Sequence, residues 1–308
     1  MKIVLVGGTG FIGRALLHNL IVKGHQVVIL TRAPSQVGNL YGGSVIAEQW
    51  DGRTVAGWAS HIAKADSVIN LAGASVAGGR WSPQRKELLL KSRIEPTKAL
   101  VDAILKHPRK PSVLINASAV GYYGNVPNLD VTETAPRGSD FPATLCGEWE
   151  REAQAASAEG VRVVLPRFGV VLDRDGGALP RLLMPFRFYA GGWLGSGNQW
   201  FPWVHREDAV RAIIHALENP ALSGPVNVAA PQAVTMKEFC ATIGKVINRP
   251  CWAPVPAFVL RLLLGEMADM FLTGQRVIPR KLLEARFGFL HPTEESALRS
   301  ILLGSSAT

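Results

Sequence analysis

A glycine-rich turn near the start of the chain constrains its fold more than any other feature. Residues 2–6 form a short apolar run rich in β-branched residues, which is typical of a parallel strand buried on both faces. The turn follows at residues 7–13, with the sequence GGTGFIG, and apolar residues then recur at helical spacing up to Gly24. Residues 26–30 form a second buried run. The segment therefore predicts a strand–helix–strand unit of a parallel sheet.

The glycines of this turn have separate physical tasks. Gly7 permits the tight turn after the strand, Gly10 lets the backbone approach a pyrophosphate, and Gly13 allows the helix to pack closely on the strand. The N-terminus of the following helix presents unsatisfied N–H groups and the positive end of its dipole to an anion. The turn therefore predicts a dinucleotide site. The contacts expected within it are Gly7, Thr9, Gly10, Phe11, Ile12 and Gly13.

The end of the second strand indicates which dinucleotide is bound. An NAD site usually has an acidic residue about 20 positions beyond the glycines, where it holds the ribose 2′-hydroxyl. This chain has Thr31 and Arg32 there, and the next carboxylate is Glu48. A guanidinium group can bind a 2′-phosphate through two hydrogen bonds, whereas a carboxylate would repel it. We therefore expect NADP rather than NAD, although a solvated arginine at a strand end is an alternative explanation for Arg32.

Strand and helix patterns keep alternating after this unit, which predicts an α/β fold with a Rossmann-type doubly wound parallel sheet. We expect residues 1–172 to form this NADP-binding domain. Glycine, proline and tryptophan then crowd residues 176–203, and helical patterns follow. Residues 173–308 are therefore expected to form a smaller substrate-side lobe packed on the first domain. Further runs with strand or helix character are residues 67–71, 83–106, 112–116, 148–158 and 161–165.

The composition indicates a globular protein that handles a small ligand. The 33 basic and 24 acidic residues give a formal net charge of +9, but the basic residues are scattered, so no nucleic-acid partner is expected. Cys146, Cys240 and Cys251 lack metal-site spacing, and no metal is expected. No run approaches the ~18–20 apolar residues of a membrane span. We therefore expect a soluble, cytoplasmic protein without a membrane partner, either a monomer or a homodimer.

Motifs along the whole chain resemble those of the extended short-chain dehydrogenase/reductases, which include NAD(P)-dependent epimerases, dehydratases and reductases of nucleotide sugars. The glycine turn, residues 70–73 (NLAG), and Ser118 ahead of residues 122–124 (YYG) carry this resemblance. The branch called epimerase family proteins, found in bacteria and mammals, is a closer match and implies a small C-terminal domain at about residues 255–303. The motifs of that branch are residues 79–81, 91–97, 173–179, 195–197, 201–205 and 274–279.

The resemblance implies cofactor contacts beyond the glycine turn. It places the adenosine 2′-phosphate at the end of the second strand, and the ribose and pyrophosphate after the third. The long helix that follows would flank the cofactor, where Arg93 is the better candidate and Glu87 is equally well explained as a solvated helix residue. The further contacts that the resemblance implies are Thr31, Arg32, Leu71, Ala72, Gly73, Glu87, Arg93, Ser118 and Arg167.

The catalytic pair of that family is missing from this chain. Its members use a Tyr-x-x-x-Lys pair to exchange a proton with the substrate, together with a nearby hydroxyl group. Counting back from Arg167 places the tyrosine at Pro142 and the lysine at Cys146. Proline has no proton to donate, and a thiol of pKa about 8.5 does not replace an ammonium group. Ser118 and Tyr123 are the catalytic residues that we predict instead. Weaker candidates are Tyr122, Cys146, Glu148, Glu150 and His205.

The substrate-side lobe is rich in tryptophan. Trp193, Trp200 and Trp203 fall where extended family members build the substrate pocket, and their faces would suit a planar or apolar group. For at least two of them, a place in the core of the lobe itself is the preferred explanation. Candidates to hold an acidic substrate group are Arg187, Arg206 and Arg276.

Three functions are consistent with these features. The first is an NADP(H)-dependent, epimerase-like oxidoreductase with a changed proton donor, acting on an unidentified small molecule. A nucleotide sugar is suggested only by analogy with the fold. The second is a non-catalytic NADP(H)-binding regulatory or sensor protein. The third, much weaker, is a nucleic-acid or membrane-surface binder, because net charge alone suggests it.

Overall fold

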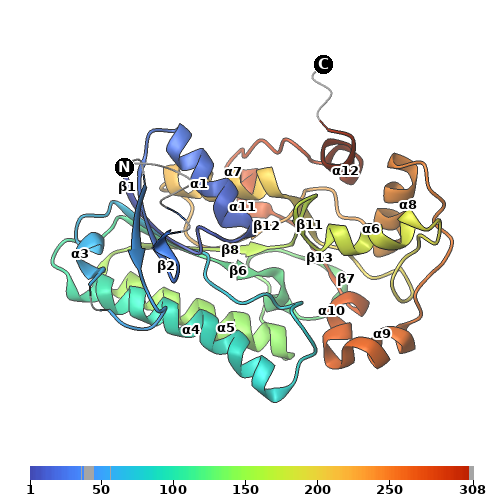
Figure 1. The fold of residues 1–308 in the computed structure, drawn as a ribbon, viewed down its shortest axis with the longest axis horizontal. Helices are drawn as coiled ribbons and strands as arrows, with labels where there is room; N and C mark the ends of the chain where they lie inside the picture. Colours follow the sequence, from blue (N-terminus) through green and yellow to red (C-terminus); the bar gives the residue numbers. More distant parts are fainter. Residues whose placement is uncertain (36, 38–44, 56, 305–308) are drawn as a thin grey trace.

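The computed structural model describes residues 1–35, 37, 45–55 and 57–304, and a parallel sheet lies at its centre (Figure 1). The eight strands of this sheet are β1 Lys2–Val6, β2 Gln26–Thr31, β3 Val45–Gln49, β4 Ser67–Asn70, β5 Val113–Asn116, β6 Ser118–Ala119, β8 Arg162–Phe168 and β12 Gly224–Val228. Their order is β12-β8-β5-β4-β1-β2-β3, and β6 pairs with β8 beside this path. The predicted Rossmann-type doubly wound sheet is confirmed.

Helices cover both faces of the sheet because successive strand residues point in opposite directions. The helices of the two layers are α1 Phe11–Val22, α3 Ala59–Ile62, α4 Pro83–Lys106, α5 Phe141–Gln154 and α7 Arg206–Glu218. Ile3 and Leu5 belong to one core with residues of α1 and α7, whereas Val4 and Val6 belong to a second core with residues of α4. In Figure 1, α1 and α7 lie above the sheet, and α4 and α5 lie below it.

The rest of the chain builds a lobe beside the carboxyl end of the sheet. Its elements are β7 Val126–Val131, β9 Val170–Asp173, β10 Gly176–Gly177, α6 Leu179–Arg187, β11 Trp203–His205, α8 Met236–Val246, α9 Ala257–Leu264, α10 Asp269–Leu272, β13 Gln275–Val277, α11 Arg280–Glu284 and α12 Glu294–Leu303. Strands β10, β9 and β11 form a small sheet, and β13 pairs with β7. Phe186, Trp203 and Phe239 are central to the core of this lobe.

Three elements that pack with the large sheet come from beyond residue 172. Helix α7 packs on α1, β12 forms the edge of the sheet beside β8, and α11 packs on β12. The division between residues 1–172 and 173–308 stays a prediction. In the structure, residues 206–228 of the second part pack with the large sheet. Residues 305–308, which end the predicted lobe, lie outside the described residues. Among the described residues, no helix combines the length and apolar character needed to cross a membrane.

Candidate functional site

The phosphate-binding turn leaves the start of α1 open to an anion. Gly7 adopts a positive φ of 77°, and a Cβ atom there would lie 2.7 Å from the Leu71 carbonyl carbon. A Cβ atom at Gly13 would lie 2.0 Å from the Gly7 carbonyl oxygen, so the strand and helix approach too closely for any side chain. Gly10 is the N-cap and supplies no side-chain acceptor, and the first turn of α1 has no acidic residue. The free N–H groups of this helix end therefore match the predicted role of residues 7–13.

We expect the substitution Gly13→Ala to lower the free energy of unfolding by about 3 kcal/mol, because the added methyl group forces the backbone of the turn apart. The matched control is Gly24→Ala, where φ is +76° but no atom lies within 4 Å of the new Cβ. The control should cost about 1 kcal/mol, from backbone strain alone. Urea denaturation measures both. Equal losses in the two variants would contradict the close approach at Gly13.

Arg32, which directly follows β2, places a cation at the carboxyl end of the sheet. Thr31 is half-buried, and its Oγ1 accepts a hydrogen bond from the Ala33 N–H at 3.2 Å. Arg32 is exposed, and no ion pair engages it within the described ranges. The nearest carboxylate along the chain, Glu48 of β3, pairs with His61 at 3.1 Å. The guanidinium of Arg32 is therefore available to a 2′-phosphate.

A buried polar network fixes the segment after β4. The Asn70 side chain donates to Asn116 Oδ1 at 2.6 Å and to Thr97 Oγ1 at 2.9 Å. Its Oδ1 accepts a hydrogen bond from the Ala72 N–H at 3.1 Å. Because Asn70 and Asn116 face each other at the ends of adjacent strands, this network sets the path of the predicted contacts Leu71, Ala72 and Gly73.

Arg93 of α4 is a buried cation beside this segment. It is 9% exposed, and its guanidinium donates to the carbonyl oxygens of Leu89 at 3.1 Å and Ala74 at 3.0 Å. A Cβ atom on Gly73 would lie 3.0 Å from the Arg93 Cζ atom, so the side chain reaches the edge of the sheet. Burial lowers the pKa of Arg93, and no carboxylate pairs with it in the described part of the chain. A buried guanidinium balanced only by neutral acceptors suits an anionic ligand.

Glu87 lies on the same helix but faces water. Its carboxylate pairs with Lys91 one turn later at 2.6 Å, and both side chains are more than half exposed. The hydrogen bond from Lys91 lowers the pKa of Glu87. This setting is that of a solvated helix residue, which was the alternative explanation for Glu87.

The structure accounts for Pro142 and Cys146, which replace the usual catalytic pair. Helix α5 begins at Phe141 instead of within the 148–158 run, because Asp140 caps it by accepting from the Ala143 N–H at 2.9 Å. Pro142 sits in the first turn, where a missing N–H costs nothing. Cys146 is buried, and burial, with a further contribution from Glu150, raises the pKa of its thiol to about 12. Neither residue can exchange a proton near neutral pH.

Ser118 and Arg167 meet at a carboxylate that the sequence ranked only as a weak candidate. Arg167 of β8 makes two hydrogen bonds to Glu150 of α5, at 2.8 and 2.7 Å, and Ser118, Glu150 and Arg167 are all buried. Ser118 donates to Oε1 of the same carboxylate at 2.5 Å. Ser118 lies at the carboxyl end of the sheet, where its hydroxyl also forms a hydrogen bond with the Cys146 thiol.

Tyr123 lies in the same network, in a setting that does not suit a proton donor. It is 2% exposed, its hydroxyl donates to Asn227 Oδ1 at 2.5 Å, and Arg167 donates to it at 3.0 Å. Burial raises the pKa of Tyr123 to about 12. The phenol therefore joins β8 to β12, while the Tyr122 ring lies 3.5 Å from the Arg167 guanidinium. Of the two predicted catalytic residues, the geometry favours Ser118.

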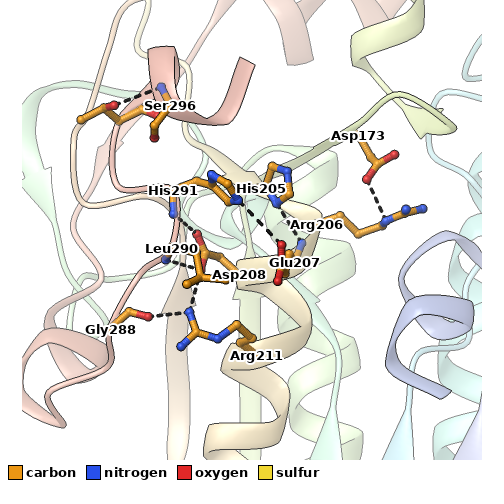
Figure 2. Close-up of polar contacts among 11 residues, drawn as sticks. Asp173, His205, Arg206, Glu207, Asp208, Arg211, Gly288, Leu290, His291 and Ser296 are labelled. Carbon is orange, nitrogen blue, oxygen red and sulfur yellow. Dashed lines mark hydrogen bonds and ion pairs between the residues drawn. The ribbon is translucent and has the colours of Figure 1, made fainter. Parts of the chain in front are cut away.

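His205 ends β11 and caps α7, as Figure 2 shows. Its Nδ1 accepts from the Glu207 N–H at 3.1 Å, and its ring lies 3.9 Å from that of His291. Asp208 accepts from the Leu290 and His291 N–H groups, at 2.8 Å each. His205, Glu207 and His291 come close enough to hold a metal ion, but the Nδ1 lone pair is already used for capping. No sequence signal pointed to His291, which lies in a separate loop.

The stability of the protein should therefore decrease as the pH is lowered, because His205 takes up a proton more readily in the unfolded state than in the folded state. Burial, then His291, lowers the pKa of His205 to about 4, against an ordinary value of 6.5. Because the folded state disfavours the charged form, the stability is fully present above pH 6.5 and is lost as the pH falls toward 4. We expect His205→Asn, which keeps a capping side chain, to remove about 2 kcal/mol of the loss between pH 7 and 4.5. If urea denaturation shows that the wild type and His205→Asn lose the same stability between pH 7 and 4.5, this assignment is wrong.

Comparisons with known proteins match this chain over most of its length. A model described as the NAD dependent epimerase/dehydratase family matches residues 3–229, and a domain of unknown function, DUF1731, matches residues 255–301. Epimerase family protein YfhF of Bacillus subtilis is 41% identical, with 98% of each chain covered. The Arabidopsis thaliana relative, an SDR39U1 homolog described as chloroplastic, is 41% identical over 98% of this chain and 87% of its own.

A solved structure extends this likeness to the whole architecture. The crystal structure of human epimerase family protein SDR39U1 with NADPH has a TM-score of 0.85 and 34% identity, and the match covers 98% of this chain and 99% of that one. Each of these three matches covers 98% of this chain. This chain belongs to the NAD dependent epimerase/dehydratase family.

Proposed function

We propose that this protein binds NADP(H) at the carboxyl end of its parallel sheet and acts as an epimerase-like oxidoreductase on a small molecule. The observation that carries the proposal is the pair of arginines, Arg32 and Arg93, which flank the open phosphate turn and have no carboxylate partner among the described residues. The human relative of known structure contains NADPH, which supports the choice of cofactor. Nucleotide sugars remain the candidate substrates by analogy of fold.

Each residue would have a physical task in such a site. The N–H groups of residues 11–13 would bind the pyrophosphate, Arg32 the 2′-phosphate, and Arg93 a further anionic or polar group near Gly73. Bound NADP(H) would supply hydride transfer. Ser118 would accept a hydrogen bond from a substrate hydroxyl, because its own proton is donated to Glu150, and Arg167 holds Glu150 in place.

A test of catalysis is the oxidation of NADPH in the presence of a panel of carbonyl compounds that includes keto sugars of nucleoside diphosphates. We expect turnover, with the proton for the reduced carbonyl taken from water, and a loss of about tenfold in kcat for Ser118→Ala, because a hydrogen bond that orients the substrate contributes about 1.5 kcal/mol. The matched control is Ser157→Ala, whose hydroxyl is exposed and bonds only to the Gln154 carbonyl group. Turnover that Ser118→Ala leaves unchanged would contradict the role of Ser118.

A second candidate function rests on Pro142 and Cys146, since this pair cannot move a proton. It is the non-catalytic NADP(H)-binding regulatory protein. Tight NADPH binding without turnover across the panel would favour it over the enzyme. The monomer or homodimer state stays a prediction, as does the cytoplasmic location, because the Arabidopsis relative is described as chloroplastic.

A further inference from the structure

Phe11, the first residue of α1, is covered by two segments that are distant in the sequence. The β9–β10 hairpin lies on one part of its ring: a Cβ atom on Gly176 would lie 2.7 Å from Phe11 Cδ2, and one on Gly177 would lie 3.2 Å from Cε1. The Arg206 guanidinium lies 5.2 Å from the centre of the ring. Because helical side chains tilt toward the N-terminus, these contacts lie at the end of α1 that carries the phosphate turn.

Asp173 and Arg206 form an ion pair above this ring. Strands β9 and β11 pair in parallel with Leu172 opposite His205, so the next residue of each strand lies side by side. The Arg206 Nε atom is 2.9 Å from Asp173 Oδ2, and the two side chains are only 23% and 14% exposed. Figure 2 shows the guanidinium directed toward α1.

The pairing leaves part of the guanidinium unused. A guanidinium group carries five N–H donors in a planar fork, and Asp173 meets it at Nε. No other ion pair or hydrogen bond of this side chain occurs among the residues that the structure describes. The terminal nitrogens therefore remain as charged donors at the positive end of α1, next to the free N–H groups of the turn.

We propose that Arg206 is a clamp for the pyrophosphate of bound NADP(H), held in place by Asp173 and the Phe11 ring. The proposal rests on the proposed function, in which the dinucleotide lies on residues 7–13. The terminal nitrogens of Arg206 bind pyrophosphate oxygens. The β9–β10 hairpin at Gly176 and Gly177 covers the turn until the Arg206 side chain moves away from it. Arg206 is thus assigned to the cofactor rather than to an acidic substrate group.

The test is the binding and release of NADPH and NADH by the full-length protein, followed by stopped-flow fluorescence. Both dinucleotides contain the pyrophosphate, so Arg206→Met should weaken both by the same factor, about tenfold, mainly through faster dissociation. Arg32→Met should weaken NADPH alone. Asp173→Asn, which keeps the shape of the side chain, should speed the release of both by about threefold. The control is Arg261→Met, which removes an exposed arginine paired with Asp269.

The outcomes separate a clamp from a structural lock. If Arg206→Met lowers the unfolding temperature but leaves both Kd values within twofold of the wild type, Arg206 only stabilises the hairpin and the proposal is wrong. The proposal is also wrong if only NADPH binding weakens. If Arg206→Met does not fold, Asp173→Asn decides through its dissociation rates. A wild-type protein that binds neither dinucleotide overturns the proposed function and this inference together, whereas wild-type binding with unchanged variants overturns only the clamp.

Discussion

Arg93→Met is expected to weaken NADPH binding by about a hundredfold while leaving the stability of the free protein within about 1 kcal/mol of the wild type. Hydrogen bonds to charged groups contribute about 1.5–3 kcal/mol, and about 1.4 kcal/mol changes an affinity tenfold. The free protein loses little, because removing a buried cation without a carboxylate partner also removes its cost of desolvation.

Calorimetric titration and urea denaturation measure the two halves of this prediction. The control is Arg109→Met, which removes an arginine that is exposed and pairs with Asp66 at the opposite end of β4. It should change neither quantity by more than experimental scatter. If Arg93→Met loses more than about 3 kcal/mol of stability and keeps its affinity, Arg93 is a structural residue of α4.

Glu150→Gln is expected to lower the free energy of unfolding by about 3–5 kcal/mol, because it leaves the Arg167 guanidinium buried without its charge partner. Arg167 and Glu150 are 3% and 7% exposed, so water cannot compensate for the lost charge. Ser118 also loses the carboxylate that holds its proton. The substitution should therefore damage both the fold and the proposed catalytic hydroxyl.

The matched control is Glu148→Gln on the same helix. Its carboxylate pairs with Arg151, but the Arg151 side chain is 73% exposed. Exposed ion pairs contribute about 0–1 kcal/mol, so this variant should unfold almost like the wild type. Similar losses in the two variants would mean that the buried pair is not a special contributor to stability.

The parts of this fold that repeat a local pattern could be predicted from the sequence. The β1–α1–β2 unit and α4 are predicted correctly, because apolar periodicity and the glycine turn act within a few residues. Strand β12 was not predicted, since Gly224 and Pro225 hide its short buried run. The start of α5 was also missed, although Asp140 ahead of Pro142 is a capping signal.

The residues of the candidate site also differ in how far the sequence predicts their roles. Arg32 follows directly from its place after β2, whereas the burial of Arg93 depends on how α4 docks against the segment after β4. The pairing of Glu150 with Arg167 brings a helix face against the adjacent strand, and spacing alone does not reveal it. Tyr123 was predicted to be catalytic because of the motif around it, and only the three-dimensional contacts with Asn227 and Arg167 assign it to the core.

The most direct test of NADP(H) binding at this site is the comparison of NADPH and NADH affinities of the wild-type protein by calorimetric titration. The two ligands differ only in the 2′-phosphate, which Arg32 would bind without competition from a nearby free carboxylate. We predict that NADPH binds at least about tenfold more tightly than NADH, and that the difference shrinks as salt is added. Equal affinities, or a preference for NADH, would contradict the assignment of this site to NADP(H).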